Sequence, residues 1–231
     1  MQEQLAEKLY YSILDDPTIL KRYQEVKIYE EKTGGWAYHD FLHVKNVTLL
    51  VEQILESLDF SKEFIYKAKI AVLLHDVGAN IGKEDHAYRS YLFAKNYFLL
   101  HHILFDDMDL VLEAIRIHSD GFDTDNMIAL ALILADKLDV KKTRISDAGL
   151  QVIGNRQYAH MEDIYLKIED QILKINFITD GSLDILEFQE YYFTKKIVQA
   201  IRSFAFKLHL HYLILIDHNV FDDQEILDCY K

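Results

Sequence analysis

The sequence predicts a mainly α-helical protein that ends in a small α+β appendage. One Pro and eight Gly in 231 residues leave few helix breakers, and half of the residues are hydrophobic, which is enough for a substantial core. Apolar residues recur at helical spacing through the first two thirds of the chain, whereas two segments after residue 160 alternate with period two. We therefore expect a helical bundle over residues 1–145 and an α+β appendage packed on it over residues 146–231.

The expected helices of the first part are separated by turn residues. An Asp-Asp-Pro sequence at residues 15–17 separates the first two helices, and a Gly pair at 34–35 ends the second. Ser61 is a suitable N-cap for the fourth helix, and Asp107 or Asp109 for the sixth. The expected spans are 2–14, 18–31, 41–57, 62 to near 78, 86–100, 110–118 and 126 to about 140.

The appendage begins with a hairpin signal. Residues 165–169 and 173–177 alternate between apolar and polar side chains around a turn at Asp170 and Gln171. A second turn is expected at Asp180-Gly181, followed by helical spacing over 187–209 and a short strand over 212–216. The appendage should therefore hold an antiparallel hairpin or a three-stranded sheet, together with a helix.

Charge and composition exclude several classes of protein. A formal net charge of −13 disfavours nucleic-acid polymers and anionic membranes as partners, because Lys and Arg bind both. The longest apolar run, 127–135, is too short to span a bilayer, and the first residues lack a signal-peptide pattern. The single cysteine, Cys229, cannot form an intrachain disulfide, and we interpret it as a bystander thiol. We therefore expect a cytoplasmic protein.

Three of the expected helices carry a His or Asp beside their apolar face. His75 and Asp76 end one apolar helix, Asp136 interrupts another that should be buried nearly all round, and His43 adjoins an apolar stripe. Each feature alone also fits an ordinary structural role: an exposed helix end, an ion pair of Asp136 with Lys137 or another base, and a core histidine. Together they favour a metal site, because a buried carboxylate needs a partner and facing helices bring such side chains together.

At these residues the chain resembles the HD superfamily of metal-dependent phosphohydrolases. The matching stretches are residues 43–47 (His-Val-Lys-Asn-Val), 72–78 (Val-Leu-Leu-His-Asp-Val-Gly) and 134–139 (Leu-Ala-Asp-Lys-Leu-Asp). The resemblance covers roughly residues 30–145. It implies that His43, His75, Asp76 and Asp136 are metal ligands.

The resemblance extends to two more histidines. In two-metal members of the family, histidines in the interval that holds His86 and His118 bind the second ion, and Asp76 would bridge the ions. The alternatives are an exposed residue at a helix start for His86, and for His118 an imidazolium at a helix C-terminus. Mixed His and carboxylate ligands suit one or two ions of Mn, Fe, Zn or Ni, with Mg less favoured. Six other histidines are expected at the surface: His101, His102, His160, His209, His211 and His218.

The resemblance implies an enzyme that hydrolyses a phosphoester or phosphoanhydride of a nucleotide or another small phosphorylated metabolite. His39, one turn before His43, is similar to the residue that protonates the leaving group in cyclic-nucleotide phosphodiesterases, and its alternative is an ordinary surface or second-sphere histidine. Lys137 and Arg144 are candidates for phosphate contacts, with Arg89 behind them. Residues 155–159 (Asn-Arg-Gln-Tyr-Ala) fall where the tail of stand-alone bacterial HD proteins begins.

Two other functions fit the same residues. Some HD-fold proteins bind two irons and use oxygen to cleave a carbon–carbon or carbon–phosphorus bond. A non-catalytic, metal-stabilised module that binds a nucleotide or a partner is the second alternative, although the complete ligand set argues against it. The sequence does not identify the substrate, and a homodimer is the default expectation for the oligomeric state.

Overall fold

The computed structural model describes residues 2–119 and 121–223, so Cys229 lies outside the described residues. The fold is mainly helical with a small α+β appendage, as the sequence predicts. The helices of the first part are α1 Gln2–Leu14, α2 Pro17–Thr33, α3 Phe41–Ser57, α4 Lys62–Leu74, α5 His86–Leu100, α6 Met108–Ile117 and α7 Met127–Leu138, with a short 3-10 helix, η1 Ala79–Ile81, after α4.

Local capping explains most of these boundaries. The Asp16 carboxylate accepts a hydrogen bond from the Thr18 backbone N–H at the start of α2, where Pro17 is the first helical residue. Asp40 caps α3 by accepting from the backbone N–H groups of Leu42 and His43. Ser61 caps α4, as expected, by accepting from the Phe64 backbone N–H. The cap at Asp40 places His43 in the first turn of α3.

The end of α4 and the cap of α6 differ from the expectation. Helix α4 ends at Leu74 and does not continue to near Gly78. The reason is that Gly78 packs closely against α5. The Gly78 N–H donates to Ser90 Oγ at 2.9 Å, and a Cβ on Gly78 would lie 2.5 Å from the Ser90 nitrogen. Asp107 precedes α6 but makes no side-chain capping bond, because its carboxylate accepts instead from Lys67 Nζ at 2.9 Å.

The appendage contains the expected hairpin and a sheet with one more strand than expected. Strands β1 Met161–Glu169 and β2 Ile172–Thr179 pair antiparallel around Asp170 and Gln171, whose positive φ angles suit a tight hairpin turn. Strand β3 His211–Ile216 pairs parallel with β2, and β4 Asn219–Val220 adds an antiparallel edge. The parallel pairing requires the helical crossover between β2 and β3.

This crossover is two helices, α8 Ile185–Glu190 and α9 Tyr192–Lys207, and not the single helix expected over 187–209. The Asp184 carboxylate caps α8, and Tyr191 then adopts an extended backbone that separates the two helices. Tyr191 is buried, and its hydroxyl donates to Asn155 Oδ1 at 3.1 Å. Tertiary packing of this ring therefore overrides the helical pattern.

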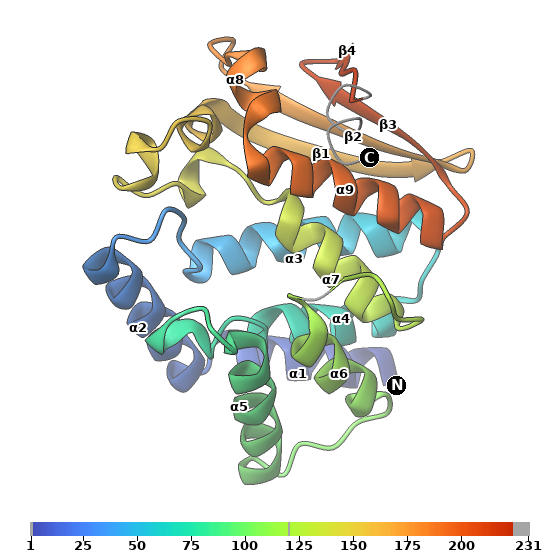
Figure 1. The fold of residues 1–231 in the computed structure, drawn as a ribbon. Helices are drawn as coiled ribbons and strands as arrows, with labels where there is room; N and C mark the ends of the chain where they lie inside the picture. Colours follow the sequence, from blue (N-terminus) through green and yellow to red (C-terminus); the bar gives the residue numbers. More distant parts are fainter. Residues whose placement is uncertain (1, 120, 224–231) are drawn as a thin grey trace.

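The appendage covers one side of the helical part. Figure 1 shows the sheet on one side of α3 and α7, with α1, α4 and α6 on the other. Helix α9 contacts α7, and α3 packs against β1. Every residue from Ile128 to Ala135 in α7 is buried, as expected for its apolar sequence. Among the described residues, no helix is both long and apolar enough to cross a membrane.

The loop between α2 and α3 joins the two parts at one edge. Ala37 forms an isolated antiparallel bridge with Ile145, and the Tyr38 N–H donates to the Arg144 carbonyl at 2.7 Å. Three short 3-10 helices follow α7 here: η2 Lys142–Arg144, η3 Gly149–Gln151 and η4 Asn155–His160. Gly149 permits the close approach, since a Cβ at this position would lie 2.1 Å from the Trp36 carbonyl oxygen.

Candidate metal centre

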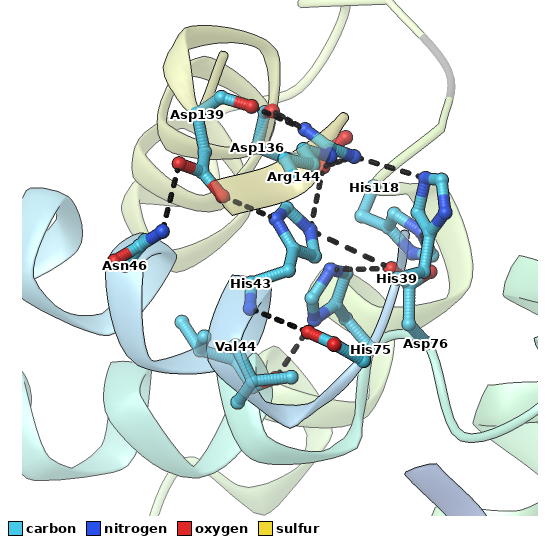
Figure 2. A network of polar contacts seen from close by, with 12 residues as sticks. His39, His43, Val44, Asn46, His75, Asp76, His118, Asp136, Asp139 and Arg144 are labelled. Carbon is cyan, nitrogen blue, oxygen red and sulfur yellow. Dashed lines mark hydrogen bonds and ion pairs between the residues drawn. The ribbon is translucent and has the colours of Figure 1, made fainter. Parts of the chain in front are cut away.

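Six candidate ligands come together because five helix ends meet near one point. His43 lies in the first turn of α3, Asp136 in the last turn of α7, and His86 opens α5. The pair His75-Asp76 directly follows α4, and His118 directly follows α6. Figure 2 shows the side chains of His43, His75, Asp76, His118 and Asp136 pointing toward a common centre.

Asp76 lies between two pairs of imidazoles. Its Oδ2 atom is 3.1 Å from His75 Nε2 and 3.7 Å from His43 Nε2. Its Oδ1 atom is 3.4 Å from His86 Nε2 and 3.5 Å from His118 Nε2. Each oxygen of this one carboxylate therefore faces its own pair of ring nitrogens, which is the arrangement that a bridging ligand requires.

The four histidines turn the same ring nitrogen toward this centre. His75, His86 and His118 each donate Nδ1–H to the carbonyl oxygen three residues earlier, at 2.7 or 2.8 Å. His43 donates Nδ1–H to Asp139 Oδ2 at 2.7 Å. A carbonyl or a carboxylate oxygen can only accept, so the proton of each neutral ring belongs on Nδ1. The Nε2 lone pairs are thereby directed at Asp76 and its neighbours, as in metal-binding histidines.

Four buried atoms at the centre have no hydrogen-bond partner within the described residues. They are His43 Nε2, His75 Nε2 and both carboxylate oxygens of Asp76. Leaving one such group unsatisfied costs about 1–3 kcal/mol and more when it is charged, so four together need another partner. A divalent cation fits this donor set of imidazole nitrogens and carboxylate oxygens.

Charge at the centre favours the ionised carboxylate. Burial opposes ionisation of Asp76, but when the facing rings are protonated, the charge of His75 and a hydrogen bond from His118 hold the pKa of this carboxyl well below its usual value. Burial lowers the pKa of His86, although Asp76 opposes this effect. His86 Nε2 lies 3.0 Å from His118 Nε2, so two lone pairs approach each other on the Asp76 Oδ1 side. A cation on that side would relieve their repulsion.

The position of Asp136 suits both a metal ligand and an ion-pair partner. Its Oδ1 atom lies 3.2 Å from His43 Nε2 and 3.2 Å from Arg144 Nη2, and its Oδ2 atom lies 3.3 Å from Lys137 Nζ. Burial opposes its ionisation, yet the positive charges of Lys137 and Arg144 help to hold the pKa of Asp136 well below its usual value. Part of its side chain remains exposed in the cavity above the centre.

Asp139 orients His43 and was not identified as a functional residue from the sequence. It is fully buried, its Oδ2 accepts from His43, and its Oδ1 accepts from Asn46 Nδ2 at 3.1 Å. Such outer partners fix the ring orientation and the tautomer of a metal-binding histidine. A second carboxylate one helical turn after Asp136 was the available signal, since residues three apart share a helix face.

His39 belongs to a second buried polar network beside the centre. Its backbone N–H and its Nδ1–H donate to the two oxygens of Glu30, at 2.8 and 2.6 Å. Its Nε2 accepts from Lys83 Nζ at 3.0 Å and from Arg144 Nη2 at 2.9 Å. Burial, followed by the positive charges of Lys83 and Arg144, holds the pKa of His39 well below its usual value, so the ring is neutral.

Glu30 and Lys83 are functional candidates that the sequence analysis missed. Burial raises the pKa of Glu30 to about 7, and loss of solvent followed by the charge of Arg144 lowers the pKa of Lys83. Lys83 lies in a loop that connects η1 to α5, where one lysine among polar residues carries no distinctive pattern. Glu30 lies in the last turn of α2, where an acidic residue is usually exposed, so only tertiary contact identifies it.

A cavity of about 440 Å³ opens above the centre. Asp76, Asp136 and His86 line its inner end, together with His39, Lys83, Lys137, Lys141 and Arg144. The appendage lines the remainder through Asn155, Tyr158, Tyr191, Tyr192 and Phe193, and the loop before α3 contributes Trp36. These aromatic residues of the appendage were not predicted as site residues from the sequence, because aromatic side chains at helical spacing are typical of an ordinary core.

The remaining sequence candidates lie away from the cavity. Arg89 is not among the described residues that line it, and its guanidinium donates to the carbonyls of Gly78, Gly82 and Glu84. His101, His102, His209, His211 and His218 are exposed, as expected, whereas His160 is partly buried in an ion pair with Asp180 at 3.0 Å.

Comparison with protein-family models identifies a family. A family model described as HD domain matches residues 40–175, which is more than half of the chain and includes all six candidate ligands. The match extends past residue 145 through β1 and into β2. No curated protein matches the chain.

Proposed function

The chain belongs to the HD domain family, a superfamily of metal-dependent hydrolases, and we propose that it is an enzyme that hydrolyses a phosphoester or phosphoanhydride. The observation that carries this proposal is the cluster of four buried, unpartnered ligand atoms directly beneath a cavity lined by basic side chains. A site for a divalent cation next to lysines and an arginine suits a substrate that carries phosphate.

We assign one ion to His43, His75, Asp76 and Asp136, and a second to Asp76, His86 and His118. The ligand atoms of two overlapping sets, His43-His75-Asp136 and His75-Asp76-His118, each lie within 4.8 Å of one another. The donor types suit Mn, Fe, Zn or Ni and, less well, Mg. When bound, such ions supply Lewis acidity, which lowers the pKa of water and withdraws charge from a phosphoryl oxygen.

Basic residues of the chain would hold the phosphate. Lys83, Lys137 and Arg144 all line the cavity next to Asp136 or His39. Arg144 is anchored by donating Nη1–H to the carbonyls of Asp136 and Asp139, at 2.9 and 2.7 Å. Its planar guanidinium is therefore oriented before substrate binds, which reduces the entropic cost of a charged hydrogen bond. Lys137 and Lys83 would add positive charge next to Asp136 and His39.

His39 would hold a proton for the leaving group only if Lys83 supplies it. The neutral ring carries its proton on Nδ1, which donates to Glu30, whereas Nε2 accepts from two cations. A proton on Nε2 must therefore come from the Lys83 ammonium, whose pKa the cavity lowers. We propose this pair as the proton donor. We also propose that the division at residue 145 separates the candidate ligands, all of which precede it, from most of the aromatic lining, to which Trp36 is the exception.

Metal analysis and a substrate panel test the proposal together. Protein purified without a chelator should contain a bound divalent transition metal, and it should release phosphate from at least one phosphomonoester, phosphodiester or anhydride when Mn²⁺ is added. The Asp136→Ala variant should lose both properties and keep the helical circular-dichroism signal. Asp125→Ala is the matched control, since it removes an exposed carboxylate just before the same helix.

Other results would contradict the proposal in distinguishable ways. Metal content with oxygen consumption and a mixed-valent iron spectrum, but no phosphate release, would favour a di-iron oxygenase. Nucleotide-dependent thermal stabilisation without turnover across the panel would favour a binding module. Absence of metal after purification and after Mn²⁺ addition would overturn the ligand assignment itself.

A further inference from the structure

Two large aromatic side chains line the cavity and remain close to half exposed. Trp36 has 45% of its surface exposed and Tyr192 has 47%, although both line a concave site. Aromatic surface left in water is unfavourable, by about 25 cal/mol per Å² of apolar area. In a concave pocket such surface is typical of residues that a ligand covers.

The chain holds the backbone of both aromatic residues in place. The Trp36 carbonyl accepts from the Ser146 N–H at 3.3 Å and lies against Gly149, where any side chain would clash. Tyr192 opens α9 directly after the buried Tyr191, whose hydroxyl is bonded to Asn155. Lys196, one turn later, lies 5.3 Å from the centre of the Tyr192 ring. The two residues are therefore fixed at the cavity before a ligand arrives.

The charges in the cavity limit what those rings can bind. Aromatic groups in a pocket can bind cations through their faces, but Lys83, Lys137, Lys141 and Arg144 line the same cavity and would repel a cationic group. These basic residues, with the candidate ligands, suit the anionic end of a ligand. A neutral planar ring is the group that suits the aromatic lining, because rings stack with offset or edge-on geometry.

We propose that Trp36 and Tyr192 bind an aromatic ring in the leaving group of the substrate, so that the appendage selects aryl or nucleobase-bearing phosphate esters. This inference rests on the proposed hydrolase function for the position of the phosphate. It makes Trp36 and Tyr192 specificity-determining residues: they act on substrate binding, and they leave the metal centre and the hydrolysis of esters without a ring unaffected.

Tryptophan fluorescence tests the contact without any turnover, because Trp36 is the single tryptophan of the chain. Metal-free protein is titrated with adenosine 5′-monophosphate, ribose 5-phosphate and inorganic phosphate, with excitation at the red edge of the indole band. We expect saturable quenching with the adenosine monophosphate and none with the other two. Equal quenching by ribose 5-phosphate, or no quenching by adenosine monophosphate at any concentration up to the millimolar range, would overturn the proposal.

Variants at Tyr192 then separate ring stacking from a structural role. Removal of an aromatic platform weakens binding of a base by about tenfold or more, so Tyr192→Ala should raise the dissociation constant for adenosine monophosphate by about that factor. Tyr192→Phe should restore binding, and Tyr192→Leu should not. Phe206→Ala is the matched control, since Phe206 is an exposed aromatic residue of the same helix and does not line the cavity.

Steady-state kinetics with Mn²⁺ distinguishes failure of this proposal from failure of the hydrolase function. Tyr192→Ala should raise KM for phenyl phosphate or adenosine monophosphate by about tenfold and leave glycerol phosphate unchanged. Equal effects on both kinds of ester would refute ring recognition while hydrolysis stands. Quenching by adenosine monophosphate with no hydrolysis of any ester would refute the hydrolase function while the ring contact stands.

Discussion

The two parts of the site, the candidate ligands (the floor) and the aromatic residues that line the cavity (the wall), differ in burial and in chemistry. The floor consists of the six candidate ligands, most of them buried, whose four imidazoles each donate a hydrogen bond to a backbone carbonyl or to Asp139. The wall consists of aromatic side chains from the appendage and the loop before α3, two of them half exposed. Unpartnered lone pairs in the floor suit the binding of a cation, whereas exposed aromatic rings in the wall suit contact with the apolar part of a ligand.

This difference indicates where sequence change would alter chemistry and where it would alter selectivity. The ligands and Asp139 lie at the ends of helices whose apolar faces form one continuous core, so their positions are determined by packing of the whole bundle. Trp36 and Tyr192 lie at a loop and at a helix start, where a substitution disturbs fewer packed neighbours. The floor should tolerate little change and the wall considerably more.

The largest expected effect is loss of a direct ligand in the floor. Because loss of an outer hydrogen-bond partner already weakens metal binding by roughly 10- to 100-fold, Asp136→Ala should weaken it by more than about 100-fold. Activity should fall with metal content, which elemental analysis and phosphate release would measure on the same sample. If Asp136→Ala retained stoichiometric metal and turnover, the assignment of Asp136 as a ligand would be wrong.

Next is a pH dependence from the buried network around His39, beside the floor. The pKa of Glu30 is about 7 in the folded chain against an ordinary value of 4.5, so the folded state binds the extra proton between these values. This contribution is complete below pH 4.5 and is lost as pH rises through about 7, which lowers the free energy of unfolding by up to about 3 kcal/mol.

Urea denaturation of metal-free protein across this pH range measures the effect. The Glu30→Gln variant should lose most of the decrease in the free energy of unfolding that Glu30 causes as pH rises, because the amide does not titrate. The amide keeps an oxygen that accepts a hydrogen bond from the His39 N–H. Identical slopes in the parent and in the variant would contradict the raised pKa of Glu30 and the hydrogen-bonded network that we describe around His39.

An intermediate effect is expected one layer behind the ligands. Asp139→Asn removes the charge that orients His43 and places an amide opposite Asn46, so metal affinity should fall by about 10- to 100-fold. Competition with a chromophoric chelator measures this, with Asp125→Asn as a surface control. An affinity equal to that of the parent would show that His43 does not need Asp139 for its orientation.

The smallest effect on the metal is expected from a change behind the wall. Gly154 has a positive φ of 82°, and a Cβ there would lie 2.5 Å from the Tyr191 side chain. Gly154→Ala should cost about 1–3 kcal/mol of stability and raise KM for aromatic esters, with metal affinity unchanged. Gly121→Ala, at a position with open space around it, is the control. A parallel loss of metal would show that floor and wall are not separable.

Local pattern was sufficient to predict most of the helical part. The break before Pro17, the cap at Ser61 and the nearly complete burial of α7 follow from residue type and apolar spacing, which act over a few neighbouring residues. The hairpin around Asp170 and Gln171 was predicted for the same reason. The end of α4 and the split at Tyr191 were not predicted, because each depends on a contact with another element. Strand β4 was not predicted because its two residues are too few for an alternating pattern.

The candidate site divides in the same way. His43, His75, Asp76 and Asp136 were accessible to the sequence because an imidazole or carboxylate next to an apolar helix face is costly to bury without a partner. Glu30 and Lys83, which lie in an ordinary helix end and an ordinary loop, had no such signal. They become functional candidates only because His39 brings them within hydrogen-bond distance of one ring.

By itself the sequence determined that this protein is helical, that it places histidines and aspartates at buried helix ends, and that these residues suit a cation. Only the tertiary structure decided that one carboxylate faces two pairs of imidazoles and that the appendage closes the cavity with aromatic side chains. Helix formation and burial are decided by near neighbours along the chain. Which ring nitrogens and carboxylate oxygens meet is decided by the packing of separate helices, as when Asp139 orients His43 from 96 residues further along the chain.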